Sequence, residues 1–304
     1  MRFTSGRFSL EGYNLKGQTI VITGATSGIG EATTGELYNR GAKVVLLCRN
    51  VGKAERLIAR LQSSEYRPCV GGGQLQIVQC ALDDLASVRK AAVELLHTNA
   101  QVDCLINNAG QGDERVTAAS YTIDNLERTM AVNYFGHFLL TVLLLERLQE
   151  SAPARIVNVS SLMYRFCKRF DVDNLNFTDA NVPYVPTQPY NCSKLAQILM
   201  TKYLASKLDK DGVTCNVLHP GLVHTNIFKD KFLTLIAPMF KTPLEGAQTS
   251  LYLAVSTDAA HVTGQYFADC AQKDTSGPYA NDMQLAEKLW TKSCQLVDVK
   301  DPFA

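Results

Sequence analysis

A short apolar run that leads directly into a cluster of glycines constrains the fold of this chain more than any other feature. Residues 19–22 read Thr-Ile-Val-Ile, and residues 23–30 continue as Thr-Gly-Ala-Thr-Ser-Gly-Ile-Gly. Glycine has no Cβ, so the backbone can turn sharply there and come close to a ligand. We expect a helix over residues 28–40, whose first turn would present free N–H groups and the positive end of its dipole to a phosphate. A second apolar run at residues 43–48 completes a strand–helix–strand unit, which indicates a dinucleotide site.

The spacing of these glycines is G-x-x-x-G-x-G, which differs from the commoner dinucleotide pattern G-x-G-x-x-G. Taken by itself, the cluster is also compatible with a tight turn that binds nothing. The rest of the chain has to decide between these two interpretations.

Composition and charge limit the classes of protein to which the chain can belong. Its 304 residues can fold as one elaborated domain or as two small ones. Apolar residues make up 46% and charged residues 19%, as in an ordinary globular protein, and a net charge of +1 argues against a general nucleic-acid binder. The nine cysteines are scattered without a C-x-x-C pair and the five histidines are isolated, so we expect reduced thiols and no metal site.

We predict no signal peptide and no membrane-spanning segment, because no apolar stretch has the required length. The most apolar helix candidate, residues 138–148, is interrupted by Thr141, Glu146 and Arg147. It is expected to lie in the core, beneath a loop, or against a second copy of the chain, so a homodimer stays open. We predict a cytoplasmic protein whose contact with an intracellular membrane, if it makes one, is peripheral.

Short apolar runs alternate with helix-like segments along almost the whole chain. The runs lack strict apolar–polar alternation, as expected for strands buried on both faces of a parallel sheet. We predict strands at residues 19–23, 43–48, 75–80, 102–106, 154–159, 213–218 and 265–268. The predicted helices are 28–40, 51–63, 85–97, 122–150, 188–208 and 245–256. This order predicts an α/β fold, a single Rossmann-type domain over residues 1–304, with a doubly wound parallel sheet of about seven strands and helices on both faces.

Two irregular stretches, residues 162–187 and 220–244, interrupt this alternation. Both follow a strand at its carboxyl end, where open α/β sheets bind ligands, and long loops in compact domains are usually functional. We predict that the second stretch is a lid over the substrate. Its apolar residues would line an apolar pocket, although about half of them could simply pack beneath the loop: Leu222, Ile227, Phe228, Phe232, Leu235, Ile236 and Phe240.

Tyr190 and Lys194 are the sharpest indication of chemistry. Four positions apart on a predicted helix, they project from one face. The pKa of tyrosine is about 10, and a nearby cation lowers it toward the range that carbonyl reduction or alcohol oxidation requires of an acid–base group. Ser160 and Ser161 end the strand at 154–159, and a serine there can hydrogen-bond the same substrate oxygen.

Two further polar features belong to the same edge of the predicted sheet. Asn107-Asn108-Ala109-Gly110 leaves the strand at 102–106, and Asn133 lies inside the long predicted helix. A buried asparagine amide can orient a water that feeds protons toward Lys194. Each feature alone has an ordinary structural explanation, but their order and their positions favour one catalytic site.

Together these motifs resemble the short-chain dehydrogenase/reductases. The resemblance spans about residues 17–295 and rests on Thr23-Gly24-x-x-x-Gly28-Ile29-Gly30, Asn107-Asn108-Ala109-Gly110, Ser161, Tyr190-x-x-x-Lys194 and Pro220-Gly221. It implies a catalytic tetrad of Asn133, Ser161, Tyr190 and Lys194. Tyr190 would donate or accept the proton, and Ser161, rather than Ser160, would hold the substrate oxygen. Lys194 would bind the nicotinamide ribose and lower the pKa of Tyr190.

The resemblance also implies the residues that contact cofactor and substrate. Ser161 and Tyr190 would contact the substrate. Residues 155–162 and 241–250, and the long separation between Ser161 and Tyr190, resemble the retinol dehydrogenase branch. That branch implies a retinoid, or a related lipid alcohol or carbonyl, as the substrate. The implied cofactor contacts are Gly24, Thr26, Ser27, Gly28, Ile29, Gly30, Arg49, Asn107, Ala109, Gly110, Tyr190, Lys194, Pro220, Gly221, Val223 and Thr225.

Arg49 indicates which dinucleotide binds. An acidic residue at the end of the second strand binds the ribose 2′-OH of NAD, whereas an arginine accommodates the 2′-phosphate of NADP. Residues 47–50 read Leu-Cys-Arg-Asn without a carboxylate, so we predict NADP(H), with a plain surface arginine as the alternative. The family often has an aspartate just past the third strand, where this chain has Ala81 and then Asp83, so the adenine contact stays unassigned.

We therefore predict an NADP(H)-dependent oxidoreductase that interconverts an apolar alcohol and its aldehyde or ketone. Where NADP is largely reduced, it would mainly reduce carbonyls. A steroid or another lipid ketone is an alternative substrate. A nucleotide-binding scaffold without activity is a third interpretation, but such a protein would be expected to have lost Tyr190 or Lys194.

Overall fold

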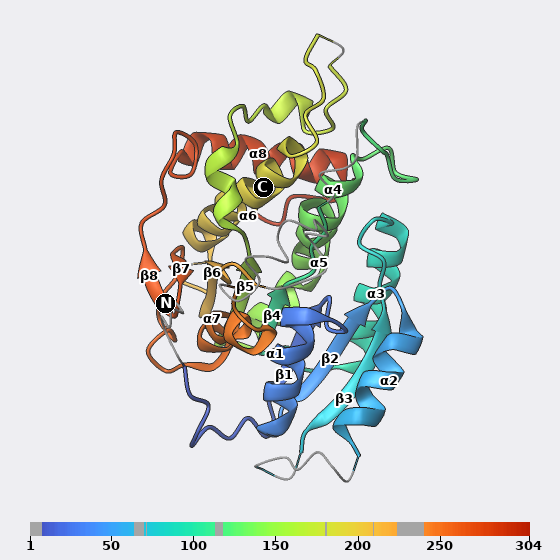
Figure 1. The fold of residues 1–304 in the computed structure, drawn as a ribbon, viewed down its shortest axis with the longest axis vertical. Helices are drawn as coiled ribbons and strands as arrows, with labels where there is room; N and C mark the ends of the chain where they lie inside the picture. The colour runs from blue at the N-terminus through green and yellow to red at the C-terminus, as the bar shows by residue number, and fades with distance from the viewer. Residues whose placement is uncertain are drawn as a thin grey trace.

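One sheet runs through the middle of the protein, with helices on both of its faces (Figure 1). The structure, a computed structural model, describes residues 8–63, 70, 72–112, 118–179, 181–208, 210–223 and 240–304. The sheet has eight strands in the order β3-β2-β1-β4-β5-β6-β7-β8, and its pairs are parallel except for β7 with β8. The strands are β1 (Thr19–Thr23), β2 (Lys43–Cys48), β3 (Gln74–Gln79), β4 (Cys104–Asn107), β5 (Ala154–Val159), β6 (Val213–His219), β7 (Tyr266–Ala268) and β8 (Ala271–Lys273).

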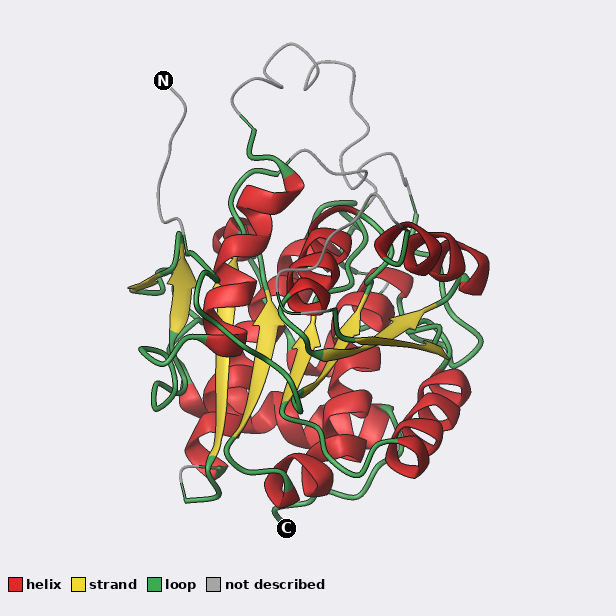
Figure 2. Ribbon diagram, turned by 90° about the horizontal axis from the view of Figure 1, so that it is seen from below, coloured by secondary structure: helices red, strands yellow, loops and turns green. Residues whose placement is uncertain are grey.

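Two layers of helices cover the sheet (Figure 2). Val21 of β1 belongs to the core shared with α3, α5 and α6, whereas its neighbours Ile20 and Ile22 belong to the core shared with α1, α2 and α7. Alternate residues of a strand face opposite sides of the sheet, which explains why these strands read as unbroken apolar runs. The helices are α1 (Gly28–Asn39), α2 (Val51–Leu61), α3 (Leu85–Thr98), α4 (Arg128–Met130), the π-helical turn η1 (Ala131–Phe135), α5 (Gly136–Glu150), the 3₁₀ turns η2 (Leu162–Phe166) and η3 (Val172–Asn174), α6 (Gln188–Lys207), α7 (Pro243–Val255) and α8 (Met283–Leu296).

The strand order reverses between β1 and β4, which is where open α/β sheets form a ligand crevice at their carboxyl ends. Thr23, Asn107, Val159 and His219 are the last residues of β1, β4, β5 and β6. These parallel strands therefore bring the polar segments that follow them to one edge of the sheet.

The doubly wound fold predicted from the sequence is confirmed, with one strand more than expected. The extra strand, β8, has only three residues, all exposed, and no apolar pattern that could announce it. The helix expected over residues 122–150 begins at Arg128, because the Glu127 side chain accepts the N–H of Met130 and caps the helix there. The helix α8 was not predicted.

The continuous helical stretch Arg128–Glu150 is long and apolar enough to cross a membrane by length and composition alone. In the structure 72% of its most apolar window is buried, and core helices of globular proteins meet the same criterion. Its last part, α5, packs against the sheet and against α3. The position in the core that was expected for this helix is therefore observed.

Candidate active site

The glycine turn after β1 has the shape needed for a ligand to approach the backbone. Gly24 and Gly28 have φ angles of +65° and +54°, in the left-handed region that side chains disfavour. A Cβ on Gly30 would lie 2.2 Å from the carbonyl oxygen of Gly24, so only glycine fits. Ser27 precedes α1 without a hydrogen bond from its side chain to the helix, so the first-turn N–H groups can donate to a phosphate.

Hydrogen bonds join this turn to the segment that follows β4. The hydroxyl oxygen of Thr23 accepts the N–H groups of Asn108 and Ala109, each at 2.9 Å. The Asn108 side chain donates to the Thr23 carbonyl, also at 2.9 Å. A Cβ on Gly110 would lie 3.4 Å from the ammonium nitrogen of Lys194. The glycine turn and the segment after β4 thus form one continuous edge of the site, called here the cofactor edge, which extends to Lys194.

The side chain of Asn107, predicted to contact the cofactor, lies in the core. Asn107 is fully buried, and its amide nitrogen donates to Thr141 at 3.0 Å and to Asn158 at 2.8 Å. Successive residues of a strand point to opposite sides, and this position faces inward. The Asn107 side chain therefore joins β4 to α5 and β5 within the core, beneath the cofactor edge.

Lys194 is a buried cation beside the ring of Tyr190. Its side chain is 3% exposed, and its ammonium donates to the carbonyl of Val159 at 3.0 Å. The ammonium nitrogen lies 5.6 Å from the centre of the Tyr190 ring. Burial lowers the pKa of Lys194 to about 8, because the charged form loses its hydration.

Ser161 comes to Tyr190 from the carboxyl end of β5. Burial raises the pKa of Tyr190, and a hydrogen bond with Ser161 opposes this by lowering it. Ser160, which the sequence left as the other candidate, is 2% exposed and donates to the carbonyl of Lys194 at 2.6 Å. The two serines thus have different positions: Ser161 meets the tyrosine, and Ser160 anchors α6.

Asn133 lies in the π-helical turn and is fully buried. Its amide nitrogen donates to the carbonyl of Gln111 at 2.8 Å and to the hydroxyl of Ser193 at 3.0 Å, and its amide oxygen accepts the N–H of Gln111 at 2.8 Å. Both amide hydrogens are therefore used within the protein. In the structure Asn133 joins the segment after β4 to Ser193, the residue next to Lys194, and one lone pair of its amide oxygen is left for the expected water.

Arg49 follows β2 with a side chain that is 74% exposed. Its guanidinium lies 3.9 Å from the carboxylate of Asp83, which also pairs with Arg128 at 3.0 Å. The N–H of Ala81 donates to the hydroxyl of Ser87 at 3.0 Å. Asp83 therefore lies between two arginines, and the main chain at Ala81 is held by Ser87.

The segment after β6 begins with Pro220 and Gly221, as the family pattern expects, and returns to the start of α1 and α7. Gly221 has a φ angle of +92°, and a Cβ there would lie 2.8 Å from the Lys241 side chain. A Cβ on Gly246 would lie 2.6 Å from Val223 and 3.1 Å from Ile29. Thr225 and the lid residues 227–236 lie outside the described residues, and Leu222 is 63% exposed.

Two contributors to this region were not predicted. A Cβ on Gly112 would lie 2.9 Å from the Tyr190 ring, so the backbone packs directly on the tyrosine. His219, at the end of β6, accepts the N–H of Leu162 at 3.2 Å, beside Ser161. Burial lowers the pKa of His219 to about 4, so it is neutral when it accepts this bond. The only sequence feature that could have indicated His219 is its polar side chain at the end of a predicted strand.

The sequence matches known families and proteins over most of its length. The family model described as short chain dehydrogenase matches residues 18–166, and the one described as enoyl-(acyl carrier protein) reductase matches residues 171–268. Retinol dehydrogenase 14 of Mus musculus is 42% identical over 94% of this chain and 87% of its own length. Retinol dehydrogenase 12 of Homo sapiens is 39% identical over 98% of this chain and 92% of its own length.

The chain belongs to the short-chain dehydrogenase family. The resemblance to the retinol dehydrogenase branch is also confirmed, and the chain is an oxidoreductase of this type. A solved structure of an uncharacterized protein from Mycobacterium paratuberculosis matches this short-chain dehydrogenase with a TM-score of 0.76 and 31% identity, over 97% of this chain and 99% of that one.

Two related structures contain a nicotinamide dinucleotide. RhlG of Pseudomonas aeruginosa was solved as an NADP active-site complex, with a TM-score of 0.66 and 26% identity over 83% of this chain and 94% of that one. The 3-ketoacyl-(acyl-carrier-protein) reductase of Brucella melitensis was solved with NADH, with a TM-score of 0.62 and 27% identity over 83% of this chain and 96% of that one. The fold accommodates both dinucleotides.

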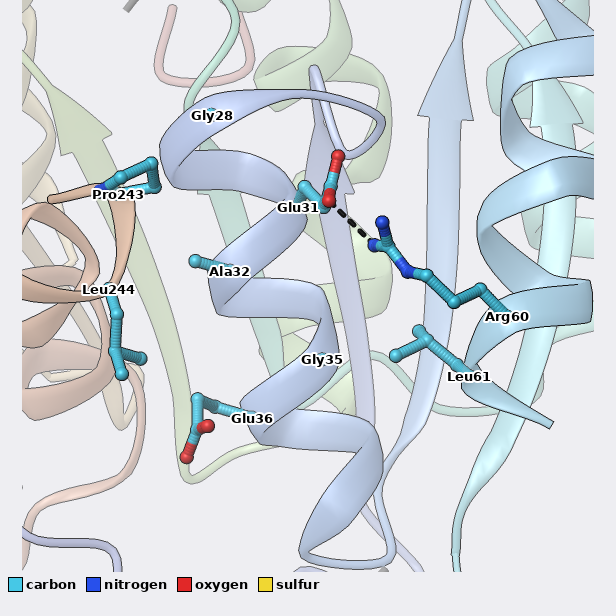
Figure 3. A pocket seen from close by; sticks show the side chains of 9 residues that line it. All are labelled: Gly28, Glu31, Ala32, Gly35, Glu36, Arg60, Leu61, Pro243 and Leu244. Carbon is cyan, nitrogen blue, oxygen red and sulfur yellow. Dashed lines mark hydrogen bonds and ion pairs between the residues drawn. The ribbon is translucent and has the colours of Figure 1, made fainter. Parts of the chain in front are cut away.

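A separate pocket of about 250 Å³ lies on the outer side of α1 (Figure 3). Glu31 of α1 and Arg60 of α2 form an ion pair of 2.6 Å on one side of it, and Pro243 and Leu244 at the start of α7 close the other. None of the four predicted catalytic residues lines it. In this short-chain dehydrogenase the pocket is therefore distinct from the cluster around Tyr190.

Proposed function

We propose that this short-chain dehydrogenase uses NADP(H) to interconvert an apolar alcohol, a retinoid or a related lipid, and its aldehyde or ketone. The observation that carries the proposal is the cluster of Ser161, Tyr190 and Lys194 at the carboxyl edge of the sheet, beside the glycine turn. This arrangement places a hydroxyl donor, a phenol and a cation around one position that a substrate oxygen can take.

Each residue of the cluster has a definite task in carbonyl reduction. Ser161 donates a hydrogen bond to the carbonyl oxygen, and the Tyr190 hydroxyl delivers its proton to the same oxygen. The Lys194 ammonium stabilises the phenolate that remains, because it lies near the ring in a site with little water. In alcohol oxidation the proton returns to Tyr190. A bound nicotinamide dinucleotide would supply or accept the hydride.

The residues at the cofactor edge fit NADP. The glycine turn and the first turn of α1 suit the pyrophosphate, because Gly24 and Gly28 adopt left-handed φ angles that turn the backbone sharply and the Ser27 side chain does not cap the helix. Arg49 is exposed and only loosely paired, so its guanidinium can bind a 2′-phosphate with two hydrogen bonds. Asn50 caps the N–H of Lys53 at 3.0 Å and brings no carboxylate to the ribose.

An apolar substrate is supported by the relatives and by the residues next to the cluster. The relatives are named for retinol, an apolar alcohol. Leu162, which follows Ser161, is 36% exposed, and Leu222, which follows Gly221, is 63% exposed. The exposed Leu162 next to Ser161 provides an apolar surface for a lipid chain, and Leu222 adds exposed apolar surface on the segment after β6.

Steady-state consumption of NADPH and NADH tests the proposal with retinal, a series of aliphatic aldehydes and a steroid ketone. We expect turnover with NADPH, a preference for the more apolar carbonyls, and loss of turnover in Tyr190→Phe. Preference for NADH would contradict the cofactor assignment, and undiminished turnover by Tyr190→Phe would contradict the mechanism. If the enzyme preferred the steroid ketone, a steroid would replace the retinoid as the proposed substrate.

The same proposal places the enzyme in the cytoplasm with at most peripheral contact with an intracellular membrane. The apolar stretch Arg128–Glu150 is largely buried against the sheet and α3, so it is engaged within the fold. Fractionation of cells followed by a carbonate wash tests this: the enzyme should be released, and retention in the washed membranes would contradict the proposal.

A further inference from the structure

A line of buried polar side chains connects the glycine turn to Asn133. His137, in the first turn of α5, is fully buried. Its Nε2 lies 2.8 Å from the hydroxyl of Thr23, and its Nδ1 lies 3.1 Å from the main-chain carbonyl of Asn133. The amide nitrogen of Gln197 on α6 lies 2.6 Å from the same carbonyl. One imidazole therefore spans the cofactor edge and the π-helical turn.

The hydrogen bonds of Thr23 determine which ring nitrogen of His137 carries the hydrogen. Its hydroxyl oxygen already accepts two N–H groups, from Asn108 and Ala109, and a hydroxyl has two lone pairs and one hydrogen. The hydrogen must therefore be donated, and the Nε2 of His137 at 2.8 Å is much nearer than the carbonyl of Ile106 at 3.5 Å. Nε2 is then an acceptor, so the ring carries its hydrogen on Nδ1 and donates it to Asn133.

His137 is held in this single neutral form. Burial lowers its pKa to about 3, the hydrogen bond to Asn133 raises it, and the charge of Lys194 lowers it further. A protonated ring would place a second N–H toward Thr23, which has no remaining lone pair to accept it. The neutral Nδ1–H tautomer satisfies both Thr23 and the Asn133 carbonyl, and the Gln197 amide nitrogen, 3.3 Å from Nδ1, donates to that carbonyl at 2.6 Å and not to the ring.

The π-helical turn explains why Asn133 needs these donors. In a π turn the backbone hydrogen bonds run between residues five apart, as when the Gly136 N–H donates to the Ala131 carbonyl, so the regular pattern of the α-helix is interrupted at Asn133. With the ring hydrogen on Nδ1, the Asn133 carbonyl accepts side-chain hydrogen bonds from both His137 and Gln197. With its carbonyl held in this way, the Asn133 side chain is fixed where it meets Gln111 and Ser193.

We propose that His137 is a positioning residue that couples the dinucleotide edge at Thr23 to the catalytic turn at Asn133. Its Nε2 side holds the edge that receives the dinucleotide, and its Nδ1 side holds the turn that aligns Ser193 and Lys194. The inference rests on the proposed placement of the dinucleotide at the glycine turn. Gln197 is the second clamp on the Asn133 carbonyl.

Three substitutions separate the two sides of the ring. In His137→Asn the amide takes the place of Nδ1, so we expect kcat within about threefold of wild type and NADPH binding weakened about tenfold. In His137→Gln the amide reaches the place of Nε2, so we expect NADPH binding to be retained and kcat to fall about tenfold. His137→Leu removes both contacts and should lose both properties.

Ser293→Ala is the matched control. Ser293 lies 2.8 Å from the hydroxyl of Tyr134, a fully buried neighbour of Asn133 in the same turn, and has no contact with the cofactor edge. This variant should lower the melting temperature and leave both kcat and NADPH binding unchanged. His137→Leu with the same pattern, a lower melting temperature alone, would overturn the proposal.

Nitrogen-15 NMR of the imidazole tests the tautomer without turnover or dinucleotide. We expect a protonated Nδ1 and a bare Nε2 at neutral pH, and a ring protonated on Nε2 would overturn the inference. A wild-type protein that shows the expected tautomer but neither binds NADPH nor reduces carbonyls would contradict the proposed function instead. The two failures are therefore distinguishable.

Discussion

The ammonium of Lys194 lies 5.6 Å from the centre of the Tyr190 ring and is tied to the carbonyl of Val159 at 3.0 Å. The strand that supplies Val159 also delivers Ser161, so one β5 end fixes both partners of the phenol. A cation buried beside a phenol favours the phenolate, and the Ser161 hydroxyl hydrogen-bonds the phenol oxygen.

Replacing Tyr190 by phenylalanine should abolish most of the activity without unfolding the protein. The ring keeps its packing on Gly112, but the proton donor and the bond with Ser161 are lost. We expect kcat to fall at least about 100-fold, within the usual range for removal of a general acid. The NADPH dissociation constant, measured by fluorescence, should stay within about threefold. Tyr252→Phe, on α7, is the control and should keep full activity.

Replacing Lys194 by methionine should stabilise the fold while it removes activity. The pKa of Lys194 lies near 8 in the folded protein and about 10.4 in an unfolded chain, so its buried charge costs roughly 3 kcal/mol at pH 7. Loss of the donor to Val159 costs about 1–2 kcal/mol in return. We expect a net gain of about 1–2 kcal/mol in the free energy of unfolding at pH 7.

The sign of the pH dependence gives this prediction a second measurement. Between pH 8 and about 10.4 the unfolded chain binds more protons at this site, so wild-type stability should rise with pH in that window. Lys194→Met should lose this contribution, and its advantage should shrink as the pH rises. Lys207→Met, at the exposed end of the same helix, should not change the pH dependence. The free energy of unfolding is measured by urea denaturation at each pH. If it changed equally with pH in wild type and Lys194→Met, the assignment of the lowered pKa to Lys194 would be contradicted.

That Ser161, Tyr190 and Lys194 lie together could be predicted, because their proximity depends little on exact register. Ser161, Tyr190 and Lys194 follow or sit on elements with strong signals, and parallel strands bring their carboxyl ends to one edge. The side-chain direction of Asn107 could not be predicted in the same way. A shift of one residue exchanges core and ligand sides at a strand end, and the local sequence is polar in either case.

Contacts between distant segments could not be predicted from the sequence, for a different reason. The carbonyl of Asn133 in the π turn is contacted by the side chains of His137 and Gln197, of which Gln197 is on another helix. The packing of Gly112 on Tyr190 depends on how the segment after β4 crosses α6. Both are set by tertiary packing, which local propensity and periodicity do not encode.

Arg49→Ala should weaken NADPH binding and leave NADH binding unchanged. The guanidinium is 74% exposed and 3.9 Å from Asp83, so its removal disturbs no buried partner, and Asp83 keeps its pair with Arg128. Loss of a charge-assisted contact to the 2′-phosphate should raise the NADPH dissociation constant about 10- to 100-fold. Arg60→Ala, which breaks the pair with Glu31, is the control and should affect neither dinucleotide. Equal weakening of NADPH and NADH would show that Arg49 does not read the phosphate.

Gly30→Ala should damage both the fold and dinucleotide binding, whereas Gly52→Ala should be harmless. The new Cβ at position 30 would lie 2.2 Å from the carbonyl oxygen of Gly24, and because that neighbour is backbone, the turn itself must move. We expect a lower melting temperature and an NADPH dissociation constant raised at least about tenfold. Gly52 lies in the first turn of α2, where the nearest atoms to a Cβ are 3.6 and 3.7 Å away.

The paired comparison isolates the effect of the turn. An alanine at position 52 removes a glycine from a helix without a clash, so its stability should rise by about 0.5–1 kcal/mol with NADPH binding intact. Melting curves and NADPH titrations of both variants measure the difference. If Gly30→Ala bound NADPH as wild type does, the glycine turn would not be where the dinucleotide approaches the backbone.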